Sequence, residues 1–401
     1  MILEIIIGLL VGIFAGTFTG LTPGIHINLF SAVMLSFSGF LLLHFPPIAL
    51  VVFLVSLSIT HTFIDYIPSV FLGAPDEDNF LSVLPGHEML NQGKAYDAIV
   101  YTLYGSASAL VIILFFSPLF FFFLPIIYPY AEKIMPLILI VASFFLIYFE
   151  KTSKLWAIII FSLSGILGLA TLTLPVKESL LPLFTGLFGV SSLITSMIKK
   201  QEIPKQKITK LKNIKIKYKS LLKSISASII ASPLCSFLPG LGSGQAAVIG
   251  SEVMGDLNRK EFLILLGSIN TIVTGLSFIT LYTINKARTG VAAAVQEITT
   301  LTVSNLFLIT LVIILAGIIS FFLTLYIARF FSKIIPKINY AILSGVIILL
   351  LFIITLIITG WLGLLILIVS TTLGLLCIYS GIRRTHMLGS LILPAIVLYL
   401  L

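Results

Sequence analysis

Small residues recur at every fourth position in two segments of this chain, and each series runs into a Pro-Gly pair. This spacing places the small side chains on one helix face, which lets a second backbone approach closely inside a membrane. The proline and glycine then end the helix. The two series differ by 216 positions throughout, with Gly8, Gly12, Gly16, Gly20, Pro23 and Gly24 matching Ser224, Ser228, Ser232, Ser236, Pro239 and Gly240. The chain therefore consists of two related halves, each beginning with a closely packed, broken helix.

The composition identifies an all-α polytopic membrane protein. Of the 401 residues, 59% are hydrophobic and 10% are charged, whereas soluble domains carry about 25% charged residues. Apolar runs predict membrane segments near residues 2–20, 47–66, 98–124, 135–149, 155–174, 180–198, 224–238, 262–282, 301–328, 340–358, 361–380 and 386–401. Since several runs are short or adjoin one another, we expect about 10–14 segments, some of them re-entrant hairpins.

The net charge of +9 is concentrated between the halves. Residues 199–223 hold ten lysines and one acid, while the rest of the chain carries 14 basic and 14 acidic residues. A lysine-rich loop between apolar helices is typical of the cytoplasmic side and argues against a nucleic-acid partner. The lipid bilayer is the expected partner, with attraction to anionic headgroups. The organisation is thus 1–198, first repeat; 199–223, cytoplasmic linker; and 224–401, second repeat.

Loop charges predict that the two repeats have opposite orientations in the plasma membrane. Basic and neutral loops alternate in each half, out of phase with each other: 128–136 neutral, 150–154 basic and 175–179 neutral, against 329–340 basic, 359–363 neutral and 381–386 basic. The positive-inside rule then places matching loops on opposite sides. This predicts an inverted-topology repeat with both termini extracytoplasmic. The alternative is that the pattern arises by chance.

Two matching turns carry opposite charges. The first-half turn contains Asp76, Glu77 and Asp78, and the second-half turn contains Lys286 and Arg288. One interpretation is that both turns lie in water. The other is that Lys286 and Arg288 neutralise an anionic substrate, since arginine offers a bidentate fork to a carboxylate.

Asp65 lies within an apolar segment and is a candidate for ion coupling. An intramembrane carboxylate is costly and usually functional, and this one could bind sodium or carry a proton. His61 lies four residues earlier on the same helix face, and Asn270 opens the matching stretch of the second half. We assign all three to ion coupling. The alternative for Asp65 is a position at the membrane interface near Pro68.

The broken helices are the predicted substrate site. Half-helix ends expose unpaired backbone groups that attract ions, and such breaks mark binding sites in secondary transporters. The predicted substrate-binding residues are Thr22, Pro23, Gly24, His26, Asn28, Pro239, Gly240, Ser243, Gln245, Lys286 and Arg288. No catalytic or phosphate-binding motif is apparent, and Cys235 and Cys377 give no metal or disulfide framework. We therefore expect a transporter without enzymatic activity or cofactor, apart from Na⁺ or H⁺ as coupling ion.

Four segments resemble the large membrane subunit of tripartite tricarboxylate transporters: residues 19–24 (TGLTPG), 236–242 (SFLPGLG), 73–95 (from GAP to HEMLNQGKA) and 183–188 (LFTGLF). The resemblance covers most of both halves. It implies ion-coupled uptake of a carboxylate delivered by an extracytoplasmic binding protein, with a small membrane subunit assisting. The charged turns at 76–78 and 284–288 depart from the family pattern, which suggests a diverged, stand-alone branch.

The predicted function is a secondary active transporter for a small organic anion, a di- or tricarboxylate, coupled to sodium or protons. The alternative is a translocase for an anionic lipid such as a polyprenyl phosphate, because paired Pro-Gly turns and a lysine-rich loop also suit phosphate headgroups. A closed polar pocket at the midplane favours the first function. A groove open sideways to lipid beside Gly240 and Arg288 favours the second.

Overall fold

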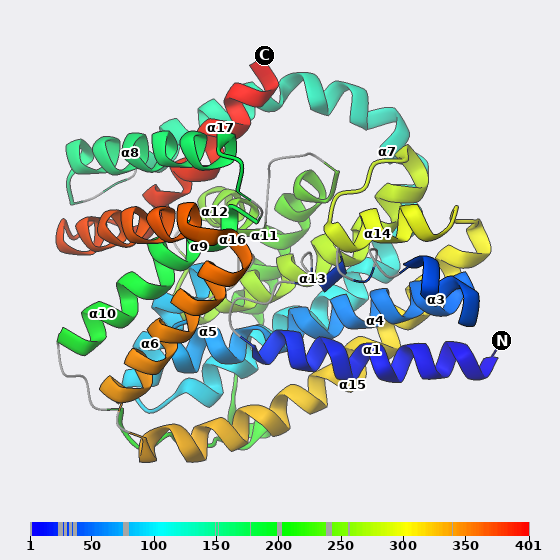
Figure 1. Cartoon of the computed structure of the whole chain (residues 1–401), viewed down its shortest axis with the longest axis horizontal. Coiled ribbons are helices and arrows are strands. Elements are labelled where there is room, and N and C mark those ends of the chain that lie inside the picture. Colours follow the sequence, from blue (N-terminus) through cyan, green and yellow to red (C-terminus); the bar gives the residue numbers. More distant parts are fainter. Residues whose placement is uncertain are drawn as a thin grey trace.

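The computed structural model is helical, with no strand among the residues that it describes (Figure 1). Those residues are 2–22, 27, 30–31, 34, 38–74, 80–148, 150, 152–176, 178–198, 203–237, 243–255, 257–338 and 340–400. Seven described helices are long and apolar enough to cross a membrane, and three further helices are apolar but shorter. The prediction of an all-α polytopic membrane protein is confirmed.

The first half contains α1 (Ile2–Leu21), α3 (Ser38–His44), α4 (Pro47–Ile64), α5 (Tyr66–Leu72), α6 (Val83–Asn91), α7 (Ala95–Tyr148), α8 (Lys154–Thr173), α9 (Leu180–Phe184), a π-helical turn (Thr185–Val190) and α10 (Ser191–Ile198). The second half contains α11 (Tyr218–Phe237), α12 (Ser243–Met254), α13 (Arg259–Ile284), α14 (Gly290–Ile298), α15 (Val303–Ile334), α16 (Tyr340–Tyr379) and α17 (Gly389–Leu400). Single-turn 3₁₀ segments lie at Phe80–Ser82, Leu211–Asn213 and Ile335–Lys337, and a longer one lies at Arg384–Leu388.

The glycine face of α1 packs directly on the backbone of α4. A Cβ atom placed on Gly8 would lie 2.6 Å from the carbonyl oxygen of Ala49, and one on Gly20 would lie 3.0 Å from Cβ of Ile64. The paired residue numbers rise together, so the two helices run parallel. Close backbone approach is the role predicted for the four-residue spacing, and the structure confirms it.

The serine face of α11 packs on α13 in the matching register. Ser224 donates a hydrogen bond to the carbonyl of Glu261 at 2.9 Å, and the hydroxyls of Ser228 and Ser268 lie 2.9 Å apart. In the first half, a Cβ on Gly12 would likewise overlap the Ser56 hydroxyl of α4. Each half thus opens with the same pair of parallel helices.

Helix α12 returns along α11 after the second Pro-Gly break. It has 12 residues, about 18 Å of helix, which is too short to cross a hydrocarbon core of about 30 Å. A Cβ on Gly250 would lie 2.9 Å from the carbonyl oxygen of Ala227, so α12 lies against α11. This short length agrees with the re-entrant hairpin predicted from the sequence, which stays a prediction.

Helices of one half cover helices of the other. A Cβ on Gly105 of α7 would lie 2.7 Å from the backbone nitrogen of Ser268 on α13. On the matching pair, Ser320 of α15 donates to the hydroxyl of Thr60 on α4 at 2.9 Å. In both contacts, a helix of one half packs on a central helix of the other half, α13 or α4.

A second pair of contacts also joins the two halves. A Cβ on Gly389 would lie 2.6 Å from the Ser164 hydroxyl, and one on Gly186 would lie 2.6 Å from Cβ of Ser370. Both contacts join a helix of one half to a helix of the other. The opposite orientation of the repeats in a membrane stays a prediction.

One predicted break is wrong and another is confirmed. Residues 128–136 were expected to form a loop, but α7 remains helical throughout its 54 residues and contains four prolines. Figure 1 shows it following a wide curve, because each proline bends a helix without necessarily ending it. In α16 the expected break at 359–363 is present, where Gly360 adopts a φ of 69° within the helix.

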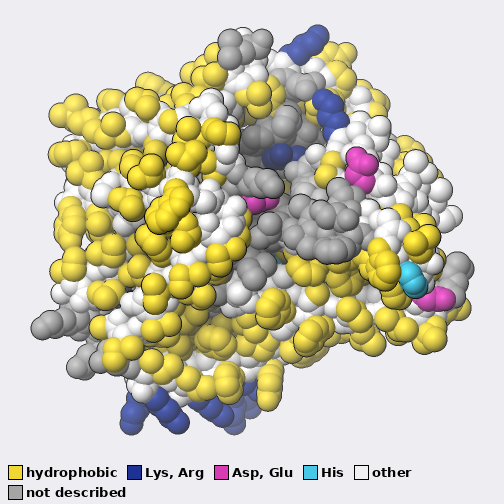
Figure 2. Space-filling view, viewed as in Figure 1, with side chains coloured by type: hydrophobic (Ala, Val, Ile, Leu, Met, Phe, Trp, Pro, Cys, Tyr) yellow, Lys and Arg dark blue, Asp and Glu magenta, His cyan; other side chains and the backbone are white. Residues whose placement is uncertain are grey.

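Hydrophobic side chains cover most of the face shown in Figure 2, with one group of Lys and Arg along its lower edge and others near its top and in the central hollow. The lysine-rich linker and the basic segment 329–340, which the charge pattern places on the same side, both contact the start of α7. The backbone N–H of Lys207 donates to the Gly93 carbonyl, and Arg329 donates to the Tyr96 hydroxyl. Exposed apolar residues on the outer helices, such as Phe115 and Phe307, fit a lipid-facing surface.

Candidate functional site

Asp65 lies at the junction of α4 and α5, in the interior of the molecule. Its exposed fraction is 3%, and the Asn270 side-chain amide donates a hydrogen bond of 2.9 Å to its Oδ2. Asn270 belongs to α13 of the other half and is also buried. Two residues assigned to the same role from sequence therefore meet across the boundary between the halves.

His61 lies one helical turn before Asp65 and faces α1. Its Nδ1 lies 3.0 Å from the hydroxyl of Thr19, which is also buried. Thr19 is in the last turn of α1, shortly before the first Pro-Gly pair. The imidazole thus connects the core helix to the end of the broken helix.

Two hydroxyl pairs lie along α4 shortly before Asp65. Thr62 and Thr271 lie side by side with their oxygens 3.2 Å apart, and Thr60 receives the hydrogen bond from Ser320. All four side chains are buried. Carboxylate, amide and hydroxyl oxygens are the ligands that hard cations take, and a buried carboxylate can also bind a proton. Among the described residues, no group of three or more His, Cys, Asp or Glu could hold a metal ion.

Only part of the predicted substrate site lies within the described residues. Pro23, Gly24, His26, Asn28, Pro239 and Gly240 lie outside them, as do Asp76, Glu77 and Asp78 of the acidic turn. Gln245 belongs to the first turn of α12. Ser243 begins α12 and is buried, and Thr22 follows α1 and donates to the Phe18 carbonyl at 2.7 Å.

The basic turn of the second half divides its two cations between different helices. Arg288 is partly buried and donates from Nε to the Cys235 carbonyl at 2.8 Å. Cys235 is in the last turn of α11, close to the second break. Lys286 is exposed, donates to the Tyr128 hydroxyl on α7 and lies 4.5 Å from the centre of that ring. The structure thus brings Arg288, but not Lys286, to the end of the broken helix.

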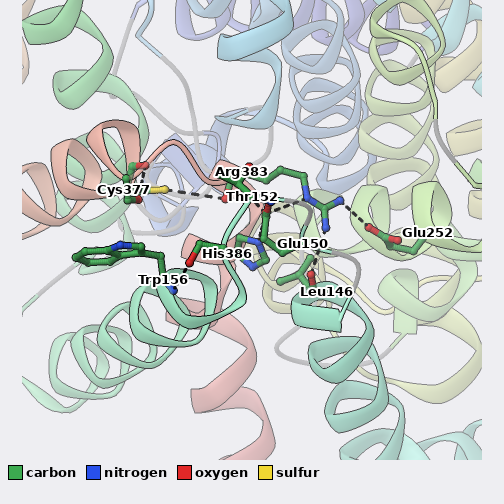
Figure 3. A network of polar contacts seen from close by, with 10 residues as sticks. Leu146, Glu150, Thr152, Trp156, Glu252, Cys377, Arg383 and His386 are labelled. Carbon is green, nitrogen blue, oxygen red and sulfur yellow. Dashed lines mark hydrogen bonds and ion pairs between the residues drawn. The ribbon is translucent and has the colours of Figure 1, made fainter.

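Sequence reasoning missed a partly buried ion cluster on the loops that follow α7 and α16 (Figure 3). Glu150 accepts hydrogen bonds from His386 at 2.7 Å, from the Arg383 side chain at 3.3 Å and from the Thr152 backbone at 2.8 Å. Arg383 also pairs with Glu252 of α12 at 3.2 Å. The cluster connects both halves to the re-entrant helix.

The hydrogen bonds decide the charge of Glu150. Burial alone would raise the pKa of Glu150, but the bonds from Thr152, His386 and the Arg383 backbone outweigh it and lower the pKa to about 2. The carboxylate is therefore ionised at neutral pH. The sequence did carry a signal for this cluster. The loops 150–154 and 381–386 are both basic and are therefore predicted on the same side of the membrane, which places the acid of one loop within reach of the cations of the other.

A comparison with protein families identifies the family of this chain. The profile of the tripartite tricarboxylate transporter TctA family matches residues 6–389. A relative from Methanocaldococcus jannaschii, named "Uncharacterized protein MJ1079", is 31% identical over 394 residues, which is 95% of each chain. No solved structure matches the chain.

Proposed function

The chain belongs to the tripartite tricarboxylate transporter TctA family, and we propose that it is a permease that takes up a di- or tricarboxylate coupled to Na⁺ or H⁺. Family membership and its apolar helices make it a multi-pass membrane protein of a transport system. We propose transport without chemical conversion of the substrate, in the plasma membrane. An extracytoplasmic binding protein and a small membrane subunit are the partners that this family suggests.

The contact between Asp65 and Asn270 is the observation that carries the proposal. A carboxylate inside a membrane protein costs about 2.5–3.5 kcal/mol at a helix centre by insertion scales, and such groups mark ion pathways. Here the carboxylate lies between core helices of the two halves, next to hydroxyl pairs and one turn from His61. Asp65 would hold the coupling ion. Asn270 would orient it, and His61 with Thr19 would pass its occupancy on to the broken helix.

For the substrate, we propose a site between the two broken helices. Arg288 supports this because its guanidinium contacts the end of α11 at Cys235. Half-helix ends offer backbone N–H groups to an anion, and arginine can hold a carboxylate with two parallel hydrogen bonds. We further propose that the linker is cytoplasmic and both termini extracytoplasmic. A cysteine at residue 205 that reacts with an impermeant maleimide from outside would contradict this orientation.

Uptake by purified protein in proteoliposomes tests the function. With an imposed Na⁺ or pH gradient, a panel of radiolabelled di- and tricarboxylates should reveal an accumulated substrate. Asp65→Asn should abolish gradient-driven accumulation but leave substrate exchange measurable, because the amide keeps the shape of the side chain and removes its charge. The exposed carboxylate of Glu297 supplies the control, Glu297→Gln, which should transport normally.

Two results would refute the proposal. Unchanged dependence of uptake on sodium and pH in Asp65→Asn would remove this residue from the mechanism. Failure of every carboxylate to be bound or transported, with binding of a polyprenyl phosphate instead, would favour the lipid translocase.

A further inference from the structure

A cavity of about 300 Å³ lies beside the ion cluster, between the π-helical turn, α6, the start of α13 and the loop before α17. Arginines supply much of its polar lining, with Arg259, Arg383 and Arg384 around it and Glu88 as the acidic residue among the described lining residues. This volume is at the lower end of the range of small-molecule sites, about 300–1,000 Å³. The cavity is separate from the contact between Asp65 and Asn270, and none of its lining residues belongs to the predicted substrate site.

Arg384 differs from the other two arginines in its partners. Arg259 pairs with Glu88, and Arg383 pairs with Glu150 and Glu252. Within the described part of the chain, Arg384 contacts no carboxylate. Its guanidinium donates to the Ser192 hydroxyl at 2.6 Å, the Ser191 hydroxyl at 3.3 Å and the Phe188 carbonyl at 3.5 Å.

These neutral acceptors fix the guanidinium without neutralising it. A guanidinium has five N–H donors, and the three contacts leave Nε and one terminal N–H without a partner among the described residues. Thr385, the next residue, also lines the cavity, and its buried hydroxyl has no hydrogen-bond partner within the described ranges. Donors that are held in place and not satisfied by protein are what an oxyanion requires.

The surrounding charge has the sign that an anion needs. A second cavity of about 720 Å³ shares Leu257 and Arg259 with the first. Together the described linings of both contain the cations Lys215, Lys217, Arg259, Lys260, Arg383 and Arg384 and the acids Glu88 and Glu261. Cations remain in excess even when Glu150 and Glu252, the partners of Arg383, are included. An excess of positive charge around a cavity raises the local concentration of anions.

We propose that this cavity is a binding site for a small oxyanion, a carboxylate or a phosphate, held by Arg384 and Thr385. Lys215 and Lys217 of the lysine-rich linker line the second cavity, which shares Leu257 and Arg259 with this one, so the site lies near the side predicted to be cytoplasmic. The oxyanion comes either from solution or from a phospholipid headgroup of the adjacent leaflet, since both present the same acceptor geometry to a guanidinium fork.

Protection of a cysteine against alkylation tests the site directly. Leu257 lines both cavities, and Leu257→Cys adds a thiol there without changing the charge; the native Cys235 and Cys377 are buried. The full chain in neutral phosphatidylcholine nanodiscs is treated with a maleimide at constant ionic strength, with citrate or inorganic phosphate replacing chloride. A second arm uses nanodiscs containing phosphatidylglycerol and neither solute. Ile338→Cys, exposed outside the cavity lining, is the control thiol.

We expect an oxyanion to slow alkylation at position 257 but not at position 338. Protection by citrate or phosphate identifies a soluble ligand, and protection only by phosphatidylglycerol identifies a headgroup. Arg384→Gln should raise the half-protecting concentration roughly tenfold or more, the loss expected for a hydrogen bond to a charged group. Arg384→Lys, which keeps the charge and loses the fork, should fall between, and Arg329→Gln should have no effect. Asp65→Asn should retain protection, which separates this site from the proposed transport site.

Two outcomes overturn the proposal: alkylation at position 257 that no solute or lipid changes, or protection that is equal in wild type and Arg384→Gln. If Arg384→Gln fails to fold, Arg384→Lys and Thr385→Val provide the same comparison. Protection that neither of these variants weakens would then reject the assignment.

Discussion

Replacing Gly16 on α1 tests whether close backbone packing holds the first broken helix in place. A Cβ atom on Gly16 would lie 2.8 Å from Cβ of Thr60 and closer still to the carbonyl oxygen of Leu57. Both atoms belong to α4, and one of them is backbone, so no side-chain rotation relieves the overlap. Gly16→Ala therefore requires α1 to move away from α4 by roughly half an ångström or more, and overpacking of this kind costs about 1–3 kcal/mol.

Gly39 on α3 provides a matched control, because no atom of the described residues lies within 4 Å of a Cβ placed on it. Alanine is favoured over glycine in a helix by about 1 kcal/mol, and both substitutions gain this term. The difference between Gly16→Ala and Gly39→Ala therefore isolates the packing cost, about 1–3 kcal/mol in favour of the Gly39 variant. Gly16→Leu should be worse than Gly16→Ala, since it adds three more carbons at the same contact.

The assay is equilibrium unfolding of the purified protein in mixed micelles, supported by yield and monodispersity after solubilisation. Gly39→Ala should unfold at or slightly above the wild-type midpoint, and Gly16→Ala below it. Equal stability of the two alanine variants would refute the packing argument. Normal yield and unfolding of Gly16→Leu would refute it more strongly, because no small shift of the helices accommodates a leucine at this position.

Two further predictions concern buried charge. Glu150→Gln should destabilise the protein by roughly 3 kcal/mol, the lower end for removing one partner of a buried ion pair. The lower end applies because Arg383 is 41% exposed. The exposed Glu178 gives a control, Glu178→Gln, and equal unfolding of the two variants would contradict the role of the cluster. In the folded protein, burial and, to a smaller extent, the charge of Arg384 lower the pKa of His87 to about 4. As the pH drops from about 6.5 towards 4, the unfolded chain therefore binds a proton at this residue before the folded chain does, and stability falls. Unfolding measured across this range should show the loss, and His87→Gln should lack that part of it; an unchanged pH profile in the variant would assign the titration elsewhere.

The helix-packing features were predictable from sequence because they depend on local spacing. The four-residue steps specify which face of a helix is smooth, and in a membrane a smooth face meets another backbone. This reasoning needs no knowledge of the partner, so it succeeded for both α1 and α11. It failed at residues 128–136, where prolines and two charged residues suggested a loop. The structure instead continues α7 through this stretch as a bent helix.

The ion-coupling candidates were predictable as single residues, but their contact was not. Asp65 and Asn270 were chosen from their place in each half, whereas their hydrogen bond depends on how α4 crosses α13. The cluster of Glu150, Arg383 and His386 was missed because loop residues were counted only for net charge. Pairing between loops distant in sequence requires the tertiary fold, although opposite charges on loops assigned to one side would have been a usable signal.

The contacts between the halves restrict the motion available to the proposed transport cycle. Gly105 and Gly267 leave no room between the backbones of α7 and α13, and α15 is bonded to α4 through Ser320 and Thr60. Rocking of one half against the other would separate these seams, since packed interfaces do not stretch continuously. In contrast, α12 packs on α11 of its own half and reaches the loop after α16 through the partly exposed pair of Arg383 and Glu252. Pairs of that kind contribute about 1 kcal/mol or less. We therefore expect alternating access to arise within the broken hairpins.

A disulfide between Thr60→Cys and Ser320→Cys tests this mechanism and should leave carboxylate uptake intact. Loss of uptake on oxidation, restored by reduction, would instead show that the halves move as rigid bodies.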